Sequence, residues 1–399
     1  MQDRPEVPDS GPKTEIPYVN RSQVALIGCH SYDEDEVRDA VREGLRLLGG
    51  ARRFLSGGER ALLKPNVLRG DDPALCVSTH PAVLKAVAQE FQKISPGISY
   101  GDSPGSSNVA AHMRKSGLSP AAEEIGLPLA DFENAQEIVF KKSPFTKKFP
   151  IAQGVLEHDA LISLPKLKTH MLTRFTGAVK NQFGCVPGTA KKGYHVKIPD
   201  VHDFSKMLVS LTLSLRPRLY IMDGIMAMEG NGPGGGDPVP MHGLLFSTDP
   251  VALDAVACML IDLPPERIPT MKPGRDWGLG TFVNDEMEIL GDSVRKLRNG
   301  DFNIDRGPLR NPIPEGIVSF FKNFMTSRPV IDRHTCIRCG VCVETCPVEP
   351  KALNRHSGRR DRPPSYRYTR CIRCYCCQEI CPEGAISVAP GLFHPFGRS

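Results

Sequence analysis

Residues 336–347 read CIRCGVCVETCP and residues 371–382 read CIRCYCCQEICP, so one motif occurs twice in the chain. In each copy three cysteines are separated by two residues, and a fourth cysteine follows after three more, directly before a proline. Thiolates are soft ligands that suit iron, and three at this spacing can hold three corners of one cubane cluster. The duplicated motif therefore predicts a small domain over residues 329–390 that holds two [4Fe–4S] clusters.

The fourth cysteine of such a motif ligates the other cluster, so the ligands are expected to cross between the two copies. Crossed ligation divides the eight cysteines into two sets: Cys336, Cys339, Cys342 and Cys381 for the first cluster, and Cys371, Cys374, Cys377 and Cys346 for the second. It also ties the two halves together, so the domain should depend on its metal for folding. A pair of zinc sites is the alternative, because C-x-x-C pairs also bind zinc.

The motif resembles that of the bacterial two-cluster ferredoxins at all eight cysteines and both prolines, which implies an α+β ferredoxin-like domain. Cys376, next to Cys377, is either a bystander, an alternative ligand or a reactive thiol. Residues 355–362, RHSGRRDR, are unusually basic. They either form a solvated loop, raise the reduction potential of a nearby cluster, or dock an acidic redox partner protein.

The composition of the chain is that of a soluble globular protein, with 40% hydrophobic and 24% charged residues among 399. No apolar run reaches the roughly 18 residues of a membrane-spanning helix, so no transmembrane segment is expected. The N-terminal residues are polar and rich in proline, unlike a signal peptide, which favours the cytoplasm. Residues 328–399 carry 12 Lys and Arg against 6 Asp and Glu, so the basic surplus lies with the cysteines.

Upstream of the cysteines, short apolar runs alternate with helical patterns. The runs at 23–29, 61–64, 98–101, 159–164, 219–222 and 244–247 are typical of buried strands. Helices are predicted after Asp33, after Thr79, over 109–116, over 201–215 and after Asp249. The alternation predicts an α/β domain over 21–292, in which helices flank a mostly parallel sheet.

The remaining segments are expected to connect or extend these two domains. Residues 1–20 are predicted to be a flexible lead-in, and residues 391–399 a C-terminal tail. Residues 293–328 are predicted to be a linker with one short helix at 315–325.

Polar residues follow several of the predicted strands: Lys64, Asn66, Asp102, Lys166 and Asp223. Ligands of open α/β sheets bind beyond the carboxyl ends of the strands, so these residues suggest one shared pocket, unless they simply mark strand ends. Lys166, Lys168 and His170 alternate along an extended segment and could point together at a carboxylate or phosphate. A solvated basic loop is the alternative. Nucleic acid is not expected as a partner, because aromatic residues are few.

Residues 223–236, DGIMAMEGNGPGGG, are rich in glycine but match neither a Walker A loop nor a dinucleotide-binding fingerprint. Such glycines allow close approach of a ligand to the backbone, so a lid over the strand ends and an ordinary loop are both open.

The strings LLKPNVL, THPAVLKAV, GDSPG, LPKLKTH, TGAVKNQFG, DGIMAMEGNGPGGG and STDPVALDAVA follow one another in this order. From about residue 20 to 292 they resemble the DUF362 family, here in its ferredoxin-fused form. The family is named for its unknown function, so the resemblance implies only which motif residues to test as a pocket for an anion: Lys64, Asn66, Asp102, Lys166, Lys168, His170, Lys180, Asn181, Glu229 and Asn231.

These observations favour an iron–sulfur oxidoreductase whose two clusters pass electrons to or from an anionic ligand at the strand ends. One alternative is an electron-transfer subunit that docks to a partner enzyme. The other is a non-redox ligand binder with structural or sensory clusters.

Overall fold

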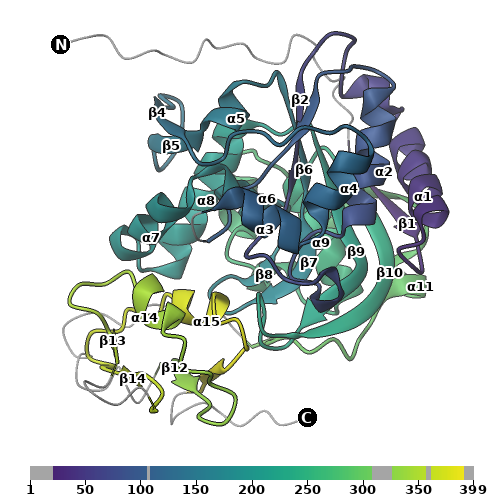
Figure 1. The fold of residues 1–399 in the computed structure, drawn as a ribbon. Coiled ribbons are helices and arrows are strands. Elements are labelled where there is room, and N and C mark those ends of the chain that lie inside the picture. The colour runs from purple at the N-terminus through teal and green to yellow at the C-terminus, as the bar shows by residue number, and fades with distance from the viewer. Residues whose placement is uncertain (1–20, 106–107, 308–325, 356–360, 391–399) are drawn as a thin grey trace.

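The computed structural model describes residues 21–105, 108–307, 326–355 and 361–390 (Figure 1). Its centre is a nine-stranded sheet in which strands run in the order β11-β1-β10-β9-β6-β2-β3, with β7 paired to β9 and β8. The strands are β1 (Ser22–Gly28), β2 (Ala61–Pro65), β3 (Ile98–Tyr100), β6 (Ala160–Leu164), β7 (Lys166–His170), β8 (Arg174–Thr176), β9 (Leu219–Glu229), β10 (Asp237–Ser247) and β11 (Met287–Gly291). Most pairings are parallel, although β10 runs antiparallel to both neighbours and β8 runs antiparallel to β7. The predicted α/β class is confirmed.

Helices cover both faces of this sheet and bury a hydrophobic core on each. One core is formed with α1 (Glu34–Leu47), α2 (Pro81–Gln92), α3 (Val109–Lys115) and α4 (Leu118–Glu124). The other is formed with α6 (Ala178–Asn181), α8 (Val201–Leu215), α9 (Pro250–Leu260) and α10 (Met271–Asp276). Smaller elements complete the domain: α5 (Gln153–Leu156), α7 (Gly188–Lys197), and a hairpin of β4 (Ala135–Val139) and β5 (Lys148–Ala152). The short helix α11 (Val294–Leu297) follows the domain and buries Leu297 in the second core.

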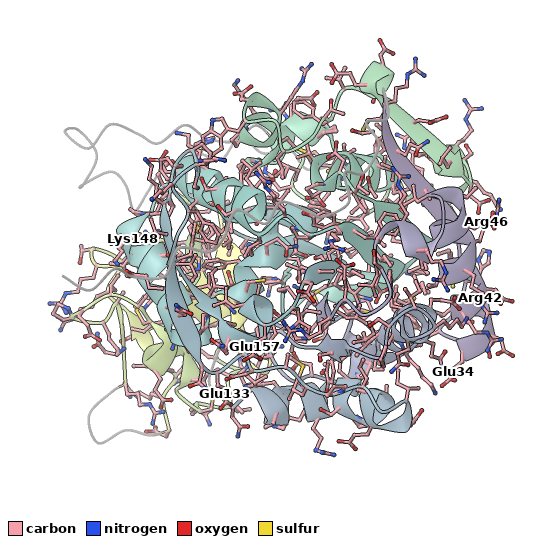
Figure 2. All side chains as sticks on the ribbon, turned by 90° about the horizontal axis from the view of Figure 1, so that it is seen from above. Glu34, Arg42, Arg46, Glu133, Lys148 and Glu157 are labelled. Carbon is pink, nitrogen blue, oxygen red and sulfur yellow. The ribbon has the colours of Figure 1, made fainter. Side chains whose placement is uncertain are left out.

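The outer side of α1 is charged, as expected for a helix with one face on the core. Figure 2 shows Glu34, Arg42 and Arg46 projecting away from the body of the molecule. Ion pairs link this helix to its neighbour, since Arg42 contacts Glu90 of α2 at 2.7 Å. This pair joins the two helices at the surface of the large domain.

Local signals placed two helix starts correctly. Asp33 caps α1 and Asp249 caps α9, each accepting hydrogen bonds from backbone N–H groups of the first turn. Glu36, three residues after Asp33, does not form a capping box with it, because its carboxylate instead accepts from the N–H of His30. The predicted cap of α2 was wrong by one residue: His80 caps the helix, because the Thr79 hydroxyl donates to the Leu164 carbonyl at 2.6 Å.

The glycine-rich segment forms the turn of a long hairpin. Strands β9 and β10 are longer than predicted, and their pairing runs out to Asp237 opposite Glu229. Residues 230–236 therefore connect two paired strands.

The C-terminal domain is small and built from short elements. Strand β12 (Arg328–Ile331) pairs antiparallel with β15 (Ile386–Ala389), and β13 (Leu353–Asn354) pairs with β14 (Ser365–Tyr366). Two short helices, α14 (Val341–Thr345) and α15 (Cys376–Glu379), follow the cysteine loops. The internal repeat is visible in the backbone, because Arg338 and Arg373 occupy equivalent positions with φ of 64° and 63°. This is the predicted ferredoxin-like domain.

In Figure 1 the small domain lies below α7 and beside β8, against one side of the large domain. None of the described helices is long and apolar enough to cross a membrane. The predicted lead-in at 1–20, the helix at 315–325, the tail at 391–399 and most of the basic stretch at 355–362 lie outside the described residues.

Candidate functional site

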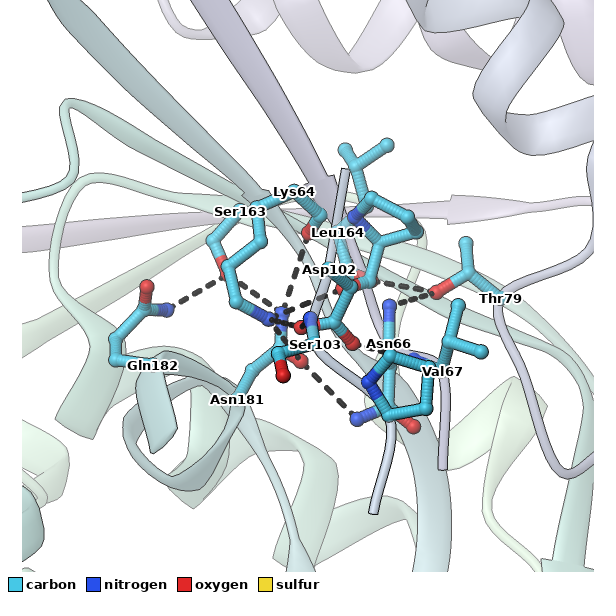
Figure 3. A network of polar contacts seen from close by, with 12 residues as sticks. Lys64, Asn66, Val67, Thr79, Asp102, Ser103, Ser163, Leu164, Asn181 and Gln182 are labelled. Carbon is cyan, nitrogen blue, oxygen red and sulfur yellow. Dashed lines mark hydrogen bonds and ion pairs between the residues drawn. The ribbon is translucent and has the colours of Figure 1, made fainter. Parts of the chain in front are cut away.

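A buried ion pair lies where β2 and β3 end. Lys64 Nζ is 2.8 Å from Asp102 Oδ1, and the two side chains are 0% and 2% exposed (Figure 3). The Asp102 carboxylate also accepts hydrogen bonds from the N–H groups of Val67 (2.6 Å) and Ser103 (2.9 Å). These bonds compensate the cost of burying a carboxylate, so the pair holds two loops together at the strand ends.

Amide and hydroxyl groups extend this pair into a network (Figure 3). Asn181 Oδ1 accepts from Asn66 Nδ2 at 3.0 Å and from Lys64 Nζ at 3.3 Å, while Asn181 Nδ2 donates to the Ser163 hydroxyl at 2.9 Å. Gly184 passes directly over the ion pair, where a Cβ would collide with Asp102 and lie 2.6 Å from Lys64 Nζ. Four of the residues singled out in the sequence therefore lie together, and a glycine permits the close approach.

A cavity of about 100 Å³ lies beyond this network, and both domains contribute to its wall. From the large domain, the polar lining includes Asn66, Asp102, Ser103, Lys168, Lys180, Asn181, Lys191, Lys192 and His195. From the small domain, the lining consists of Thr345, Cys376, Glu379 and Ile380. A water molecule needs about 10–15 Å³ on this measure, so the cavity holds several waters or a ligand of a few heavy atoms.

Three lysines give this cavity a positive character. Lys168 Nζ donates to the Val77 carbonyl and Lys191 Nζ to the Ser103 and Pro104 carbonyls, whereas Lys180 has no hydrogen-bond partner among the described residues. Within the described ranges none of the three forms an ion pair with a carboxylate. Burial lowers the pKa of Lys168 to about 7 and that of Lys191 to about 8, and it also lowers the pKa of Lys180. A bound anion would stabilise all three ammonium groups.

One contact across the domain interface joins His170, which does not line the cavity, to a carboxylate that does. His170 Nε2 lies 3.1 Å from Glu379 Oε1. Burial lowers the pKa of His170 to about 4, so its imidazole is neutral near pH 7. Burial alone would raise the pKa of Glu379, but His170, Lys180 and His195 outweigh it and lower that pKa. Glu379 is therefore a carboxylate that faces the lysines of the other domain.

The other residues that the sequence predicted for the pocket do not line the cavity. Lys166 turns to a neighbouring buried cluster, where its Nζ lies 2.8 Å from Asp223 Oδ2 and 2.8 Å from the Tyr32 hydroxyl. The pairing of β7 with β9 shifts register between Lys166 and Lys168, so the two lysines do not share one ligand site. Glu229 accepts the backbone N–H of Asn303 at 2.7 Å and does not line the cavity.

The glycine-rich turn docks the small domain. A Cβ on Gly234 would lie 2.6 Å from the Glu379 carbonyl oxygen, and one on Gly235 would lie 2.9 Å from Gly384 Cα. Asn231 does not line the cavity but belongs to the same interface, because its side-chain oxygen accepts from Gln378 Nε2 at 3.0 Å. The glycines of the turn therefore allow its backbone to approach the small domain closely.

Arg69 links the turn and the small domain to a loop of the large domain. Its guanidinium lies 2.6 Å from Asp71, donates to the carbonyl of Gly234, and donates across the interface to the carbonyls of Glu379 and Cys381. The side chain is buried, and nothing in the local sequence distinguished it.

The cysteines of the small domain surround two further cavities. One is lined by Cys336, Cys339, Cys342 and Cys381, and the other by Cys346, Cys371, Cys374 and Cys377. These are the two sets expected from crossed ligation. Apolar side chains such as Ile386 and Leu353 line the rest of the walls. Four thiols around a mostly apolar cavity fit an iron–sulfur cluster in donor chemistry and in surroundings.

Cys376 does not line either cysteine cavity. It occupies the position equivalent to Val341 in the first copy of the motif, and its side chain lines the interdomain cavity instead. Thr345 lines the same cavity, and it precedes Cys346 as Cys376 precedes Cys377. The interdomain cavity is therefore one residue away from two cysteines of the second set and, through Ile380, from Cys381 of the first set. The sequence showed Cys376 as an extra cysteine but not the direction of its side chain.

Comparison with known proteins gives two matches to protein families. Residues 61–259 match the domain of unknown function DUF362, and residues 328–382 match the 4Fe-4S dicluster domain. The thylakoid-associated protein sll1697 of Synechocystis sp. (strain ATCC 27184 / PCC 6803 / Kazusa) is 36% identical over 309 residues, which cover 75% of this chain and 94% of that protein. The cluster domain makes this chain an iron–sulfur protein.

Two solved structures are distantly similar. The lactate racemase apoprotein from Thermoanaerobacterium thermosaccharolyticum is 12% identical with a TM-score of 0.42, over 60% of this chain and 57% of that one. A structural genomics target from Thermotoga maritima is 12% identical with a TM-score of 0.35, over 55% of this chain and 56% of that one. At these scores neither likeness bears on function.

Proposed function

Because the chain belongs to the DUF362 family and carries a C-terminal 4Fe-4S dicluster domain, we propose that it is an iron–sulfur oxidoreductase. Two [4Fe–4S] clusters, held by the two sets of cysteines, supply single electrons to or take them from a small anion in the interdomain cavity. We place the large domain at 21–292, the connecting segment at 293–328 and the cluster domain at 329–390.

The observation that carries this proposal is the position of the cavity. Cys376 and Thr345 line it, and each is the chain neighbour of a cysteine of the second set, while Ile380 lines it next to Cys381 of the first set. The opposite wall carries Lys168, Lys180 and Lys191. An anion held by these lysines would therefore lie between the large domain and residues of the small domain that adjoin cysteines of both sets.

One cysteine of the first set reaches the surface of the small domain. Cys339 is exposed, and the neighbouring Ile337 is 58% exposed. A redox partner protein can approach this exposed part of the first set, whereas Cys381 of the same set follows Ile380, which lines the interdomain cavity.

The experiment uses the holoprotein purified without oxygen. Native mass spectrometry identifies any retained small molecule, and the reduced protein is then mixed with that molecule while visible absorbance reports oxidation of the clusters. Lys180→Met should abolish the ligand-dependent oxidation, and Lys197→Met, an exposed lysine of α7, should leave it unchanged. Equal oxidation rates in both variants would contradict the assignment of the cavity.

We also retain the cytoplasm as the proposed location, because reduced thiolates persist there. The name of the cyanobacterial relative supports the alternative of attachment to a membrane surface. Cell fractionation separates the two, since recovery of the protein with membranes at low salt would contradict a cytoplasmic location.

A further inference from the structure

The charges that surround the interdomain cavity do not cancel. The Lys64 ammonium is already paired with Asp102 at 2.8 Å, so this pair adds no net charge. Lys168, Lys180 and Lys191 bring three positive charges to the lining, and Glu379 brings one negative charge. Lys192 also lines the cavity, and like Lys180 and Lys191 it is partly exposed, so water screens part of the charge of these three lysines. When its lysines are protonated, the lining therefore carries an excess of at least two positive charges over Glu379.

The cavity also has an unused hydrogen-bond acceptor and an available imidazole. Asn66 Oδ1 is buried without a hydrogen-bond partner in the described part of the chain. His195 is 8% exposed, stacks on Phe204 at 4.6 Å and lines the cavity with no hydrogen bond among the described residues. Buried polar groups normally have a hydrogen-bond partner. A ligand that both donates and accepts hydrogen bonds would provide partners for Asn66 Oδ1 and the His195 imidazole.

The volume restricts the ligand further. About 100 Å³ is too small for a flavin or a dinucleotide, and it requires the two negative charges of a ligand to lie close together. A phosphate carries two charges on one centre near neutral pH, and its oxygens accept strong hydrogen bonds from lysine.

We propose that the interdomain cavity binds a compact oxyanion that carries two negative charges, of the phosphate type, held by the ammonium groups of Lys168, Lys180 and Lys191. This deepens the proposed function by naming the class of its anionic ligand. The oxyanion is either free or the charged group of a small ester.

Binding of such an anion should be accompanied by proton uptake. The free protein holds these lysines with lowered pKa values, chiefly through burial. The ionisable groups that act on them are Lys64, Lys166, Asp71, Asp102, Glu379, Cys185 and Cys376, in addition to the three lysines themselves. Two added negative charges favour the protonated form of each lysine, so the pKa values rise and protons are taken up.

Isothermal titration calorimetry on the oxidised holoprotein tests this proposal with inorganic phosphate, methyl phosphate and acetate at about pH 8 and constant ionic strength. Phosphate should bind at least about tenfold more tightly than acetate, because acetate carries one charge. The measured heat should vary with the ionisation enthalpy of the buffer, which reports proton uptake. Equal or better binding of methyl phosphate indicates an ester as the source, and weaker binding indicates the free ion.

Substitutions of the lysines test whether phosphate binds in the interdomain cavity. Lys180→Met should weaken phosphate binding by about tenfold or more, Lys180→Arg should restore it, and Lys197→Met should leave it within about twofold. If Lys180→Met loses iron, Lys191→Met replaces it in the comparison. Absence of phosphate binding, acetate binding as tight as phosphate, or unchanged binding in Lys180→Met and Lys191→Met would each overturn the proposal. Because no electron is transferred in this assay, phosphate binding without ligand-dependent cluster oxidation would refute only the redox function.

Discussion

Replacement of Arg69 by methionine should loosen the docking of the two domains. The Arg69 guanidinium donates across the interface to the carbonyls of Cys381 and Glu379, the latter at 3.4 Å. A hydrogen bond from a charged donor contributes about 1.5–3 kcal/mol, and the longer contact contributes less than the shorter one. Together they stabilise the docked arrangement by about 3 kcal/mol, which corresponds to a change of roughly a hundredfold in the docking equilibrium.

Hydrogen exchange followed by mass spectrometry measures this equilibrium on both sides of the interface. Residues 230–236 of the turn and residues 378–386 of the small domain are the segments to follow. When reclosing is fast, the exchange rate is proportional to the open population, so amides exposed by undocking should exchange up to about a hundredfold faster in Arg69→Met. Both proteins are compared at equal iron content, because loss of metal would also accelerate exchange in the small domain.

Arg52→Met is the matched control, because Arg52 is an exposed arginine of the same domain that does not contact the interface. Its exchange should equal that of the unmodified protein in both segments. If Arg69→Met also exchanges like the control while its iron content is unchanged, the guanidinium does not hold the domains together, and the reasoning is refuted.

Three further predictions concern the ion pair, the buried lysine and the metal. Lys64→Met leaves the Asp102 carboxylate buried without its charged partner, which should cost about 3–5 kcal/mol of stability. Thermal melts should show that the double variant with Asp102→Asn is more stable than Lys64→Met alone. Burial lowers the pKa of Lys168 to about 7, so between about pH 7 and pH 9 the unfolded chain binds more protons than the folded chain. The contribution of this residue to stability should therefore rise with pH over this range. Thermal melts of Lys168→Met should show a weaker dependence of stability on pH. Removal of iron with a chelator should unfold the small domain, measured as rapid exchange over residues 328–390, and retained protection after complete iron loss would contradict it.

The sequence predicted those features that depend on neighbours along the chain. The caps of α1 and α9 follow from Asp33 and Asp249, which reach backbone N–H groups two or three residues away. The two sets of cysteines that surround the two cavities follow from spacing and duplication. By contrast, Thr79 was assigned as a cap because its bond to Leu164 joins residues far apart in the sequence.

The candidate site was predicted only in part, for the same physical reason. Lys64, Asn66, Asp102 and Asn181 do form one network, because parallel strands end at one edge of the sheet. The contribution of Glu379 and Cys376 could not be predicted, because it depends on how the small domain docks. The contact between the glycine-rich turn and the small domain could not be predicted either, because no local sequence pattern shows which backbone segment will approach a glycine.

The shared wall of the interdomain cavity has a consequence for the maturation of the protein. Glu379 and Cys376 reach the cavity only when α15 is formed, and this helix lies between cysteines that are expected to need iron to fold. A newly made chain without iron would therefore present three lysines to solvent but no enclosed cavity. Under the proposed function, cofactor insertion would then act as a checkpoint in biogenesis, because the chain would gain the proposed ligand site only together with its clusters.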